Sequence, residues 1–317
     1  MRYRRSMSTS PTVITIENDH WRVGLVPATG GSVAFGQVRI DGDWVDVLRP
    51  TAEEDRGNRS ACASFPLVPW SNRIREGKLL WQGRTYQLRT NPGDGTARHG
   101  AAIEYPWAVV AQSANSVTLE FTSRDVYGVN FPWTFTARFE YTLEGDRFTW
   151  GLSVTNTDHE TFPAGLGHHP YFQRHLALPD GTESAAPHLQ INCDQSYQLI
   201  DALPEAAAVP IAPRADFQTS RELGTGVVDD CLTGRTSPTV AVIEYPGKLA
   251  VTMRAGELLS HVIAFAPEGK PFFAVEPVTN VNDAFTLDAQ GVKGTGLFLV
   301  QPGETRHTEF SLTASNV

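Results

Sequence analysis

The sequence predicts an all-β protein, and three observations carry that prediction. Short segments that alternate between apolar and polar residues, or run apolar with β-branched residues, recur between turn residues along the chain. Glycine and proline, with 27 and 21 residues, exceed their usual combined share of about 12% and supply frequent turns. No capped amphipathic helix of ten or more residues stands out, so helices should be few and short.

The expected elements follow from these patterns in chain order. Strands are predicted at residues 12–18, 21–27 and 117–123, twice within 131–157, and then at 239–246, 249–255, 260–267, 272–277 and 296–303. The pair within 131–157 should form a hairpin, because Glu144-Gly145-Asp146 is a turn signal between two alternating runs. Residues 202–217, rich in alanine and proline, predict a loop excursion. Many short strands separated by turns indicate a sandwich.

The length of the chain and its uniform composition indicate the domain organisation. The 317 residues contain no sequence repeat, low-complexity segment or composition break. All-β folds of this size often form one unit, and the chain is long enough to bury a large core. We therefore expect a flexible N-terminal tail over residues 1–12 and a single β-sandwich domain over residues 13–317.

Charge and composition exclude several classes of function. The formal net charge of -9 disfavours a nucleic-acid partner, because phosphate binding needs a basic face. No window approaches the roughly 18 apolar residues of a membrane helix, and the basic, polar N-terminus lacks the apolar run of a secretory signal. Three cysteines, Cys62, Cys193 and Cys231, are an odd number and far apart, which favours a reducing compartment. A cytoplasmic protein is expected.

The most unusual stretch is Gly165–Phe172, GLGHHPYF, which packs two histidines and two aromatic residues into eight positions. In an extended chain His168 and His169 point to opposite faces, so one imidazole is presented in a fixed direction. Tyr171 and Phe172 would offer flat apolar surface beside it. Such a combination suits a sugar, whose C–H faces stack on rings while its hydroxyls need donors and acceptors. A buried strand with two structural histidines is the alternative.

Four other places carry polar residues within or beside apolar or glycine-containing segments, where a role in a site is plausible from the sequence. Arg73 follows an apolar, proline-rich run, and His99 precedes a glycine that permits close approach. Asp229 and Asp230 enter an apolar segment, where a strand would direct at most one of them into a site. Glu276 ends a strongly apolar strand, which costs free energy unless the carboxylate is paired or functional. Each of these residues also has a structural alternative.

Several kinds of site are poorly supported. The glycine-rich loops lack the Lys-Ser/Thr of a phosphate-binding P-loop, which argues against nucleotide binding. No Cys-x₂-Cys or His-x₃-His spacing supports a structural zinc site. Without a Gly-x-Ser-x-Gly elbow, a serine hydrolase is not indicated.

Taken in order, the motifs PWSNRI, RHG, GHHPYF, VDDCL and VEPVTNVNDAF resemble the aldose 1-epimerase (galactose mutarotase) family. GKLLWQGRTY follows the arginine motif, and LVQPGE is expected to close the last strand. Each motif alone is weak, but their order and spacing run from about residue 20 to 312 and are specific together. Ala101 departs from the pattern, since many similar sequences carry a second glycine there.

The resemblance implies a β-supersandwich of two large antiparallel sheets with a sugar cleft, acting on a hexose such as galactose. It implies His169 as general acid, because this histidine directly precedes Pro-Tyr-Phe, and Glu276 as general base. Arg73, His99 and Asp229 match the residues that hold sugar hydroxyls, Asp229 being chosen over Asp230 because it follows the apolar Val228. The only partner implied is a small aldose, with no metal or organic cofactor, and a monomer or weak homodimer is expected.

Two alternatives to a free-aldose 1-epimerase stay open from the sequence. A hexose-6-phosphate 1-epimerase would need a further cationic cluster beside the cleft; Arg73 and Arg75 are close in sequence, but no other strong basic grouping is visible. A non-catalytic sugar-binding protein would keep the cleft without the chemistry. A glycosidase is less favoured, because its second acidic partner is not clearly placed.

Overall fold

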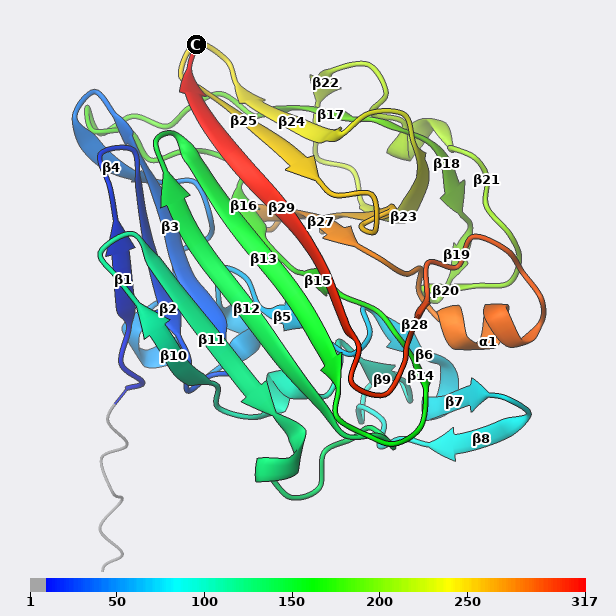
Figure 1. Cartoon of the computed structure of the whole chain (residues 1–317). Helices are drawn as coiled ribbons and strands as arrows, with labels where there is room; N and C mark the ends of the chain where they lie inside the picture. The colour runs from blue at the N-terminus through cyan, green and yellow to red at the C-terminus, as the bar shows by residue number, and fades with distance from the viewer. Residues whose placement is uncertain (1–9) are drawn as a thin grey trace, which may run out of the picture.

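Two large antiparallel sheets dominate the computed structural model, which describes residues 10–317 (Figure 1). The nine-stranded sheet runs β10 (Ala108–Gln112), β11 (Ser116–Thr122), β12 (Phe135–Glu144), β13 (Arg147–Asn156), β29 (Thr305–Asn316), β25 (Leu249–Ala255), β24 (Thr239–Tyr245), β17 (His188–Ile191), β22 (Arg221–Glu222). The eight-stranded sheet runs β21 (Val209–Pro210), β18 (Cys193–Tyr197), β23 (Val228–Arg235), β26 (His261–Ala266), β27 (Phe272–Val278), β15 (Gly167–His168), β5 (Pro66–Leu67), with β16 (Tyr171–Gln173) also beside β27. The predicted supersandwich is confirmed.

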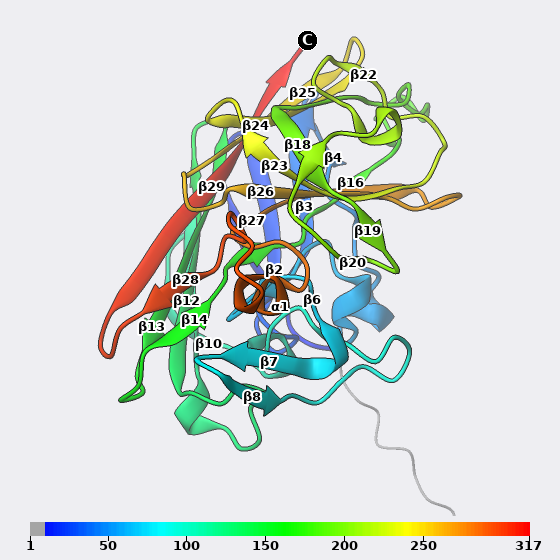
Figure 2. The same cartoon turned by 90° about the vertical axis from the view of Figure 1, so that its right-hand side faces the viewer.

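Smaller elements surround these sheets. A four-stranded sheet contains β1 (Ile14–Glu17), β2 (Trp21–Val26), β3 (Ser32–Ile40) and β4 (Asp43–Asp46). Two-stranded pairs join β6 (Arg73–Ile74) to β9 (Ala97–Arg98), β7 (Lys78–Trp81) to β8 (Arg84–Gln87), β14 (Phe162–Ala164) to β28 (Phe298–Val300), and β19 (Leu199–Ile200) to β20 (Leu203–Pro204). The turned view shows β7 and β8 below α1 (Ala284–Ala289), the one α-helix of the described residues (Figure 2).

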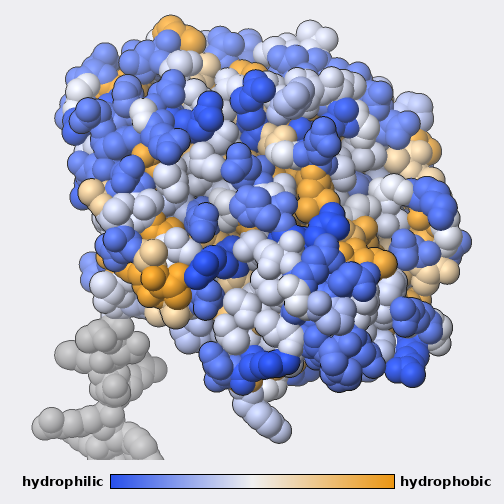
Figure 3. All heavy atoms as spheres, in the orientation of Figure 1, coloured by the Kyte–Doolittle hydropathy of each residue, from blue (hydrophilic) through white to orange (hydrophobic). Residues whose placement is uncertain are grey.

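The core lies between the sheets because strand residues alternate. In β12, Phe135, Ala137, Phe139 and Tyr141 are buried, while the alternate residues Thr136, Arg138 and Glu140 are partly or fully exposed. Across the sheet, Trp150 of β13 stacks on Phe310 of β29 with ring centroids 4.6 Å apart. Each such side chain contributes about 1.5–3 kcal/mol by leaving water. The face in Figure 3 is accordingly mostly hydrophilic, with apolar colour confined to scattered areas.

The predicted hairpin is confirmed. Glu144 pairs with Arg147, which leaves Gly145 and Asp146 as a two-residue turn. Gly145 has a φ of 56°, the left-handed conformation that such tight turns favour. Residues 202–217 form only the two-residue pieces of β20 and β21 and a 3-10 turn at Pro213–Ala215, as the loop prediction expected.

One prediction about the C-terminus was wrong. The segment at 296–303 is not the last strand, because β28 occupies only three residues and the twelve-residue β29 follows it. The register of β29 against both β13 and β25 places it in the middle of the nine-stranded sheet. Its sequence is polar on the outer face and mixed on the inner one, so tertiary pairing rather than local pattern creates it.

The expected tail over residues 1–12 lies largely outside the described residues. Within 10–317, no helix has the length and apolar character needed to cross a membrane.

Candidate active site

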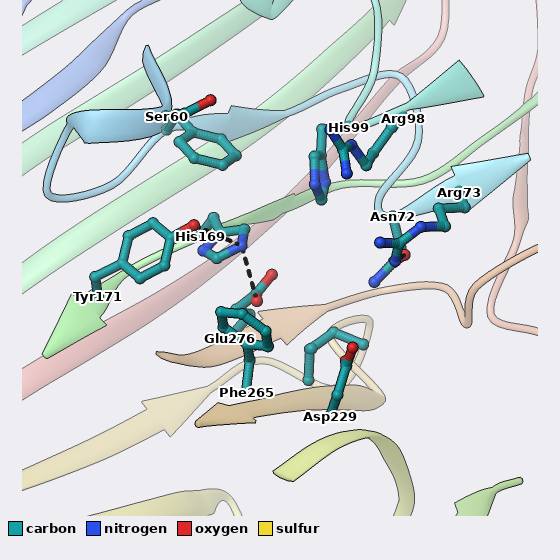
Figure 4. Close-up of a pocket in the computed structure, with 12 residues that line it drawn as sticks. Ser60, Asn72, Arg73, Arg98, His99, His169, Tyr171, Asp229, Phe265 and Glu276 are labelled. Atoms are coloured by element: carbon teal, nitrogen blue, oxygen red, sulfur yellow. Dashed lines mark hydrogen bonds and ion pairs between the residues drawn. The ribbon is translucent and has the colours of Figure 1, made fainter. Parts of the chain in front are cut away.

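A cavity of about 220 Å³ opens on the face of the eight-stranded sheet that is turned away from the inter-sheet core. The structure brings Arg73, His99, His169, Asp229 and Glu276 together around it (Figure 4). These five residues come from positions spread over some two hundred residues of sequence, so only the fold unites them. The full lining consists of Ser60, Phe65, Asn72, Arg73, Arg98, His99, His169, Tyr171, Asp229, Ile263, Phe265 and Glu276.

Strand alternation in β27 directs Glu276 into the cavity. Phe273 and Val275 belong to the inter-sheet core, whereas Ala274 and Glu276 face the other way. Glu276 pairs across the ladder with Ile263 of β26 and is only 2% exposed. The apolar strand therefore holds a carboxyl group rigidly in a nearly water-free position.

The two adjacent histidines have separate environments, as alternation predicts. The His168 ring lies in the core, where Nδ1 contacts the Ser64 hydroxyl and Nε2 lies 3.0 Å from the Tyr141 hydroxyl. Both of its ring nitrogens are thereby satisfied inside the sandwich. His169 lines the cavity instead, and its backbone N–H donates to the Phe65 carbonyl at 3.1 Å.

The aromatic pair after Pro170 is divided in the same way, which corrects the expectation that both rings flank the histidine. Tyr171 lines the cavity, with its hydroxyl 3.3 Å from Nε2 of His169. Phe172 is fully buried in the inter-sheet core, where it stacks on Phe273 at 5.7 Å. Because successive side chains alternate, only one of the two could face the site.

Asp229 and Asp230 are also separated by alternation. Asp229, in β23, lines the cavity, and burial raises the pKa of its carboxyl while Arg73 opposes the shift. Asp230 is buried behind it and binds the guanidinium of Arg214 through both oxygens, one at 2.8 Å. Asp230 is thus a structural ion pair, and Asp229 is the carboxylate available to a ligand.

The short pairing of β6 with β9 positions the arginine side of the cavity. Arg73 and Arg98 are direct register partners, and the backbone N–H of His99 donates to the Asn72 carbonyl at 2.8 Å. Asn72 and His99 both have positive φ, 55° and 66°. Non-glycine residues in this conformation store strain and cluster at functional sites.

A direct polar contact inside the cavity joins the two predicted catalytic residues. Nε2 of His169 lies 3.1 Å from Oε1 of Glu276, and both side chains are almost fully buried. Burial lowers the pKa of His169 to about 3. Burial also raises the pKa of Glu276 well above its usual value, and Asp229 raises it further. Both shifts favour uncharged forms, so this buried pair holds one proton between its two members.

Two buried histidine nitrogens at the cavity lack a hydrogen-bond partner within the described chain. Among residues 10–317, Nδ1 of His99 and Nδ1 of His169 are buried without a hydrogen-bond partner. Buried polar atoms are normally paired, so exceptions beside a cavity indicate capacity reserved for a ligand or for chemistry.

Sequence reasoning missed part of the lining. Arg98 stood inside a quoted motif but received no role, because the register that sets it opposite Arg73 is not visible in sequence. Phe65 and Phe265 enter as apolar walls, and Ser60 comes from a 3-10 turn, Arg59–Ala61, that carries no motif. Asn72, which stands before Arg73 in the motif PWSNRI, lines the cavity as well.

Solved structures of similar shape identify the fold of this protein. A galactose mutarotase-like protein from Clostridium acetobutylicum matches with a TM-score of 0.84 at 18% identity, covering 96% of this chain and 95% of its own. A GalM/aldose epimerase homologue from C. elegans matches with a TM-score of 0.81 at 17% identity, covering 96% and 99%. The fold is that of the galactose mutarotase-like β-sandwich proteins.

The sequence comparison is more specific. The aldose 1-epimerase family profile matches residues 12–313, and the chain belongs to this family. Among its relatives, the uncharacterized protein YphB of Escherichia coli is 29% identical over 287 residues, which are 86% of this chain and 91% of that protein. The resemblance drawn from the ordered motifs is confirmed.

Proposed function

We propose that the protein is an aldose 1-epimerase that interconverts the α- and β-anomers of an aldose by opening and reclosing the sugar ring. The observation that carries this proposal is the buried contact of 3.1 Å between His169 and Glu276 inside a small cavity. An acid and a base in direct reach of one bound molecule are what the reaction requires.

The chemistry assigns each residue one proton transfer. Glu276 as carboxylate takes the proton of the C1 hydroxyl, while His169 as imidazolium donates its proton to the ring oxygen. The bond from C1 to the ring oxygen breaks and the C1 carbonyl forms, so the proton count is unchanged. After rotation about the C1–C2 bond, the two residues exchange roles and the ring closes on the other face.

The electrostatics of the His169–Glu276 pair suit this exchange. The reactive imidazolium–carboxylate form and the neutral form favoured by burial contain the same single proton. They differ only by its transfer across the 3.1 Å contact. A pair that can hold the proton on either member is matched to a reaction that must run equally well from both anomers.

The remaining lining suits a single sugar ring. Donors from Arg73 and His99 and an acceptor from Asp229 would bind hydroxyls away from C1 and leave C1–C2 free to rotate. The cavity volume of about 220 Å³ is below the roughly 300–1,000 Å³ of pockets for drug-sized ligands, which favours a monosaccharide over an oligosaccharide.

Polarimetry tests the proposal directly. Freshly dissolved α-D-galactose and α-D-glucose should reach the same equilibrium rotation faster when catalytic amounts of the protein are added. If the optical rotation changes at the spontaneous rate for every aldose tried, while sugar binding is measurable, the protein is a non-catalytic sugar-binding protein and the proposal is wrong.

The pH dependence should reflect the shifted pKa values. Because the pKa of His169 in the free protein is about 3 rather than 6.5, the pair gains no second proton as the pH falls from 8 to 5. The raised pKa of Glu276 likewise keeps the shared proton in place above pH 4.5, its ordinary value. We therefore expect kcat/KM, corrected for the spontaneous rate, to show no acid limb near pH 6.5. A decline centred there would contradict the assignment.

The neighbouring aspartates should respond in opposite ways. Asp229→Asn is expected to raise KM about tenfold or more, because a charged hydrogen bond to the sugar is weakened, and to leave stability unchanged. Asp230→Asn should leave KM unchanged but lower the free energy of unfolding by about 1–3 kcal/mol, because the Arg214 pair is broken. Steady-state kinetics and urea denaturation of both variants check this. The reverse pattern would identify Asp230 as the ligand-facing residue.

A further inference from the structure

The Nε2 atom of His169 has two oxygen atoms within reach, although it can bond fully with only one of them. Oε1 of Glu276 lies 3.1 Å away and the hydroxyl oxygen of Tyr171 lies 3.3 Å away, and Figure 4 draws both contacts. A ring nitrogen of histidine carries either one hydrogen or one lone pair. When Glu276 bonds elsewhere, Tyr171 is therefore the group in place to bond with Nε2.

The proposed reaction requires Glu276 to bond elsewhere. Its carboxylate must turn to the C1 hydroxyl of the sugar, and it remains at C1 as a carboxylic acid once it has taken that proton. His169, having given its proton to the ring oxygen, then has a lone pair on Nε2. Nδ1 of His169 is buried and has no hydrogen-bond partner among residues 10–317. The imidazole therefore needs another group to keep its orientation while the open-chain aldehyde rotates.

Tyr171 presents a hydroxyl group that is held rigidly enough for this task. The residue is 9% exposed, its backbone N–H donates to the carbonyl of Ala63 at 2.9 Å, and its carbonyl accepts from the N–H of Arg49 at 2.9 Å. Its ring packs against that of His169 with centroids 4.3 Å apart. Burial raises the pKa of Tyr171, and the charge of Glu276 raises it further, so the hydroxyl keeps its hydrogen at neutral pH.

Arg49 fixes the ring of Tyr171 and polarises it. Its guanidinium carbon lies 3.9 Å from the centroid of the Tyr171 ring and 4.5 Å from that of Phe272. The guanidinium also donates to the backbone carbonyls of Ser60, at 2.8 Å, and Cys62. A cation over an aromatic ring attracts its π-electrons, which makes the hydroxyl of a tyrosine a stronger hydrogen-bond donor.

We propose that Tyr171 is a positioning residue for the acid–base pair: its hydroxyl donates to Nε2 of His169 while Glu276 is engaged with the sugar, and Arg49 holds Tyr171 for that donation. This inference rests on the proposed epimerase function. Tyr171 forms and breaks no covalent bond and keeps its proton, so His169 and Glu276 still carry both proton transfers. An apolar wall would need only the ring of Tyr171, whereas this role needs the hydroxyl.

Tyr171→Phe removes the hydroxyl and keeps the ring that lines the cavity. We expect kcat to fall about five- to tenfold, as for the loss of one hydrogen bond, and KM to stay unchanged. Two-dimensional exchange NMR of glucose and galactose, over a range of sugar concentrations, measures both constants. A wild-type kcat in the variant, with KM raised or unchanged, would overturn the inference.

Tyr197→Phe is the matched control. Tyr197 is also buried, at 1% exposure, but its hydroxyl donates to the carbonyl of Gly294 at 3.0 Å and it does not line the cavity. This variant should keep the wild-type kcat and KM, while its urea midpoint falls because a buried hydrogen bond is lost. Equal losses of kcat in the two variants would assign the effect to a weakened fold and overturn the inference.

Arg49→Gln tests whether Arg49 acts through the hydroxyl of Tyr171. Alone it should lower kcat by less than Tyr171→Phe does, and the double variant should lose no more kcat than Tyr171→Phe alone. Independent, additive losses would show that Arg49 does not act through Tyr171. The Tyr171→Phe result stands by itself if Arg49→Gln weakens the fold.

A spectroscopic measurement observes the proposed hydrogen bond without relying on catalysis. In Glu276→Ala, Tyr171 is the remaining partner of Nε2, so NMR of ¹⁵N-histidine-labelled protein should show this nitrogen unprotonated and accepting a hydrogen bond. Adding Tyr171→Phe should shift its resonance, which is assigned by its absence in His169→Asn. A protonated Nε2, or no shift, would overturn the inference. Absence of catalysis by the wild-type protein with every aldose would instead overturn the proposed function.

Discussion

Replacing Glu276 with Gln is expected to lower the rate of anomer interconversion about 10²–10⁴-fold, the usual contribution of one general acid or base. The amide fills the same space in β27 but cannot accept the proton of the C1 hydroxyl. Stopped-flow or polarimetric rates, with the spontaneous rate subtracted, measure the loss. A variant with a near wild-type rate would show that Glu276 is not the base.

The same substitution should not weaken the fold, which separates chemistry from stability. Burial raises the pKa of Glu276, so the folded state holds this proton more tightly than the unfolded chain. The contribution of this carboxyl group to the free energy of unfolding is most favourable below about pH 4.5, its pKa in the unfolded chain. That contribution is lost as the pH rises through the higher pKa of the folded state. At pH 8 the Gln variant should therefore have an equal or higher urea midpoint. A lower midpoint would reveal a structural role.

His169→Asn should cause a loss of similar size, and the double variant should lose little more than either single variant. Acid and base act on one molecule in one step, so their effects are not additive. The exposed His20 supplies a control, because His20→Asn removes a histidine that touches neither the cavity nor the core. Additive losses in the double variant would indicate that the two residues act independently.

Gly100→Ala is expected to destabilise the protein by more than about 3 kcal/mol. Gly100 has a φ of +79°, and a Cβ there would lie 2.1 Å from the carbonyl oxygen of Val68. That carbonyl also accepts hydrogen bonds from Ala101 and Ala102, so it cannot move away freely. Because His99 directly precedes Gly100, the variant should lose sugar binding as well.

A matched glycine separates the clash from backbone strain. Gly128 has nearly the same φ, +76°, but a Cβ there would meet nothing within 4 Å. Gly128→Ala should cost only the about 1–2 kcal/mol of a left-handed alanine. Urea denaturation of both variants provides the comparison. Equal losses would mean that close packing on Val68 contributes nothing beyond the backbone conformation.

The sequence alone was enough to predict the elements that depend on residues close together in the chain. The Gly145 hairpin and the scarcity of helices follow from local pattern and turn chemistry. The period of two residues in a strand also predicted that His168 and His169, and likewise Asp229 and Asp230, would face opposite sides. The ordered motifs then assigned His169 and Asp229 to the cleft, and both line the cavity. The same rule, applied to Tyr171 and Phe172, would have removed one error.

Tertiary structure decided what depends on pairing between distant segments. The twelve residues of β29 become the longest strand because β13 and β25 accept them on both sides, although their own pattern is weak. The register of β6 against β9 sets Arg98 opposite Arg73, which sequence spacing cannot show. A local pattern fixes the face to which a side chain points, but the partner on that face is chosen by long-range packing. The chemistry of single residues could therefore be predicted from the sequence, whereas the way in which they are arranged around one cavity could not.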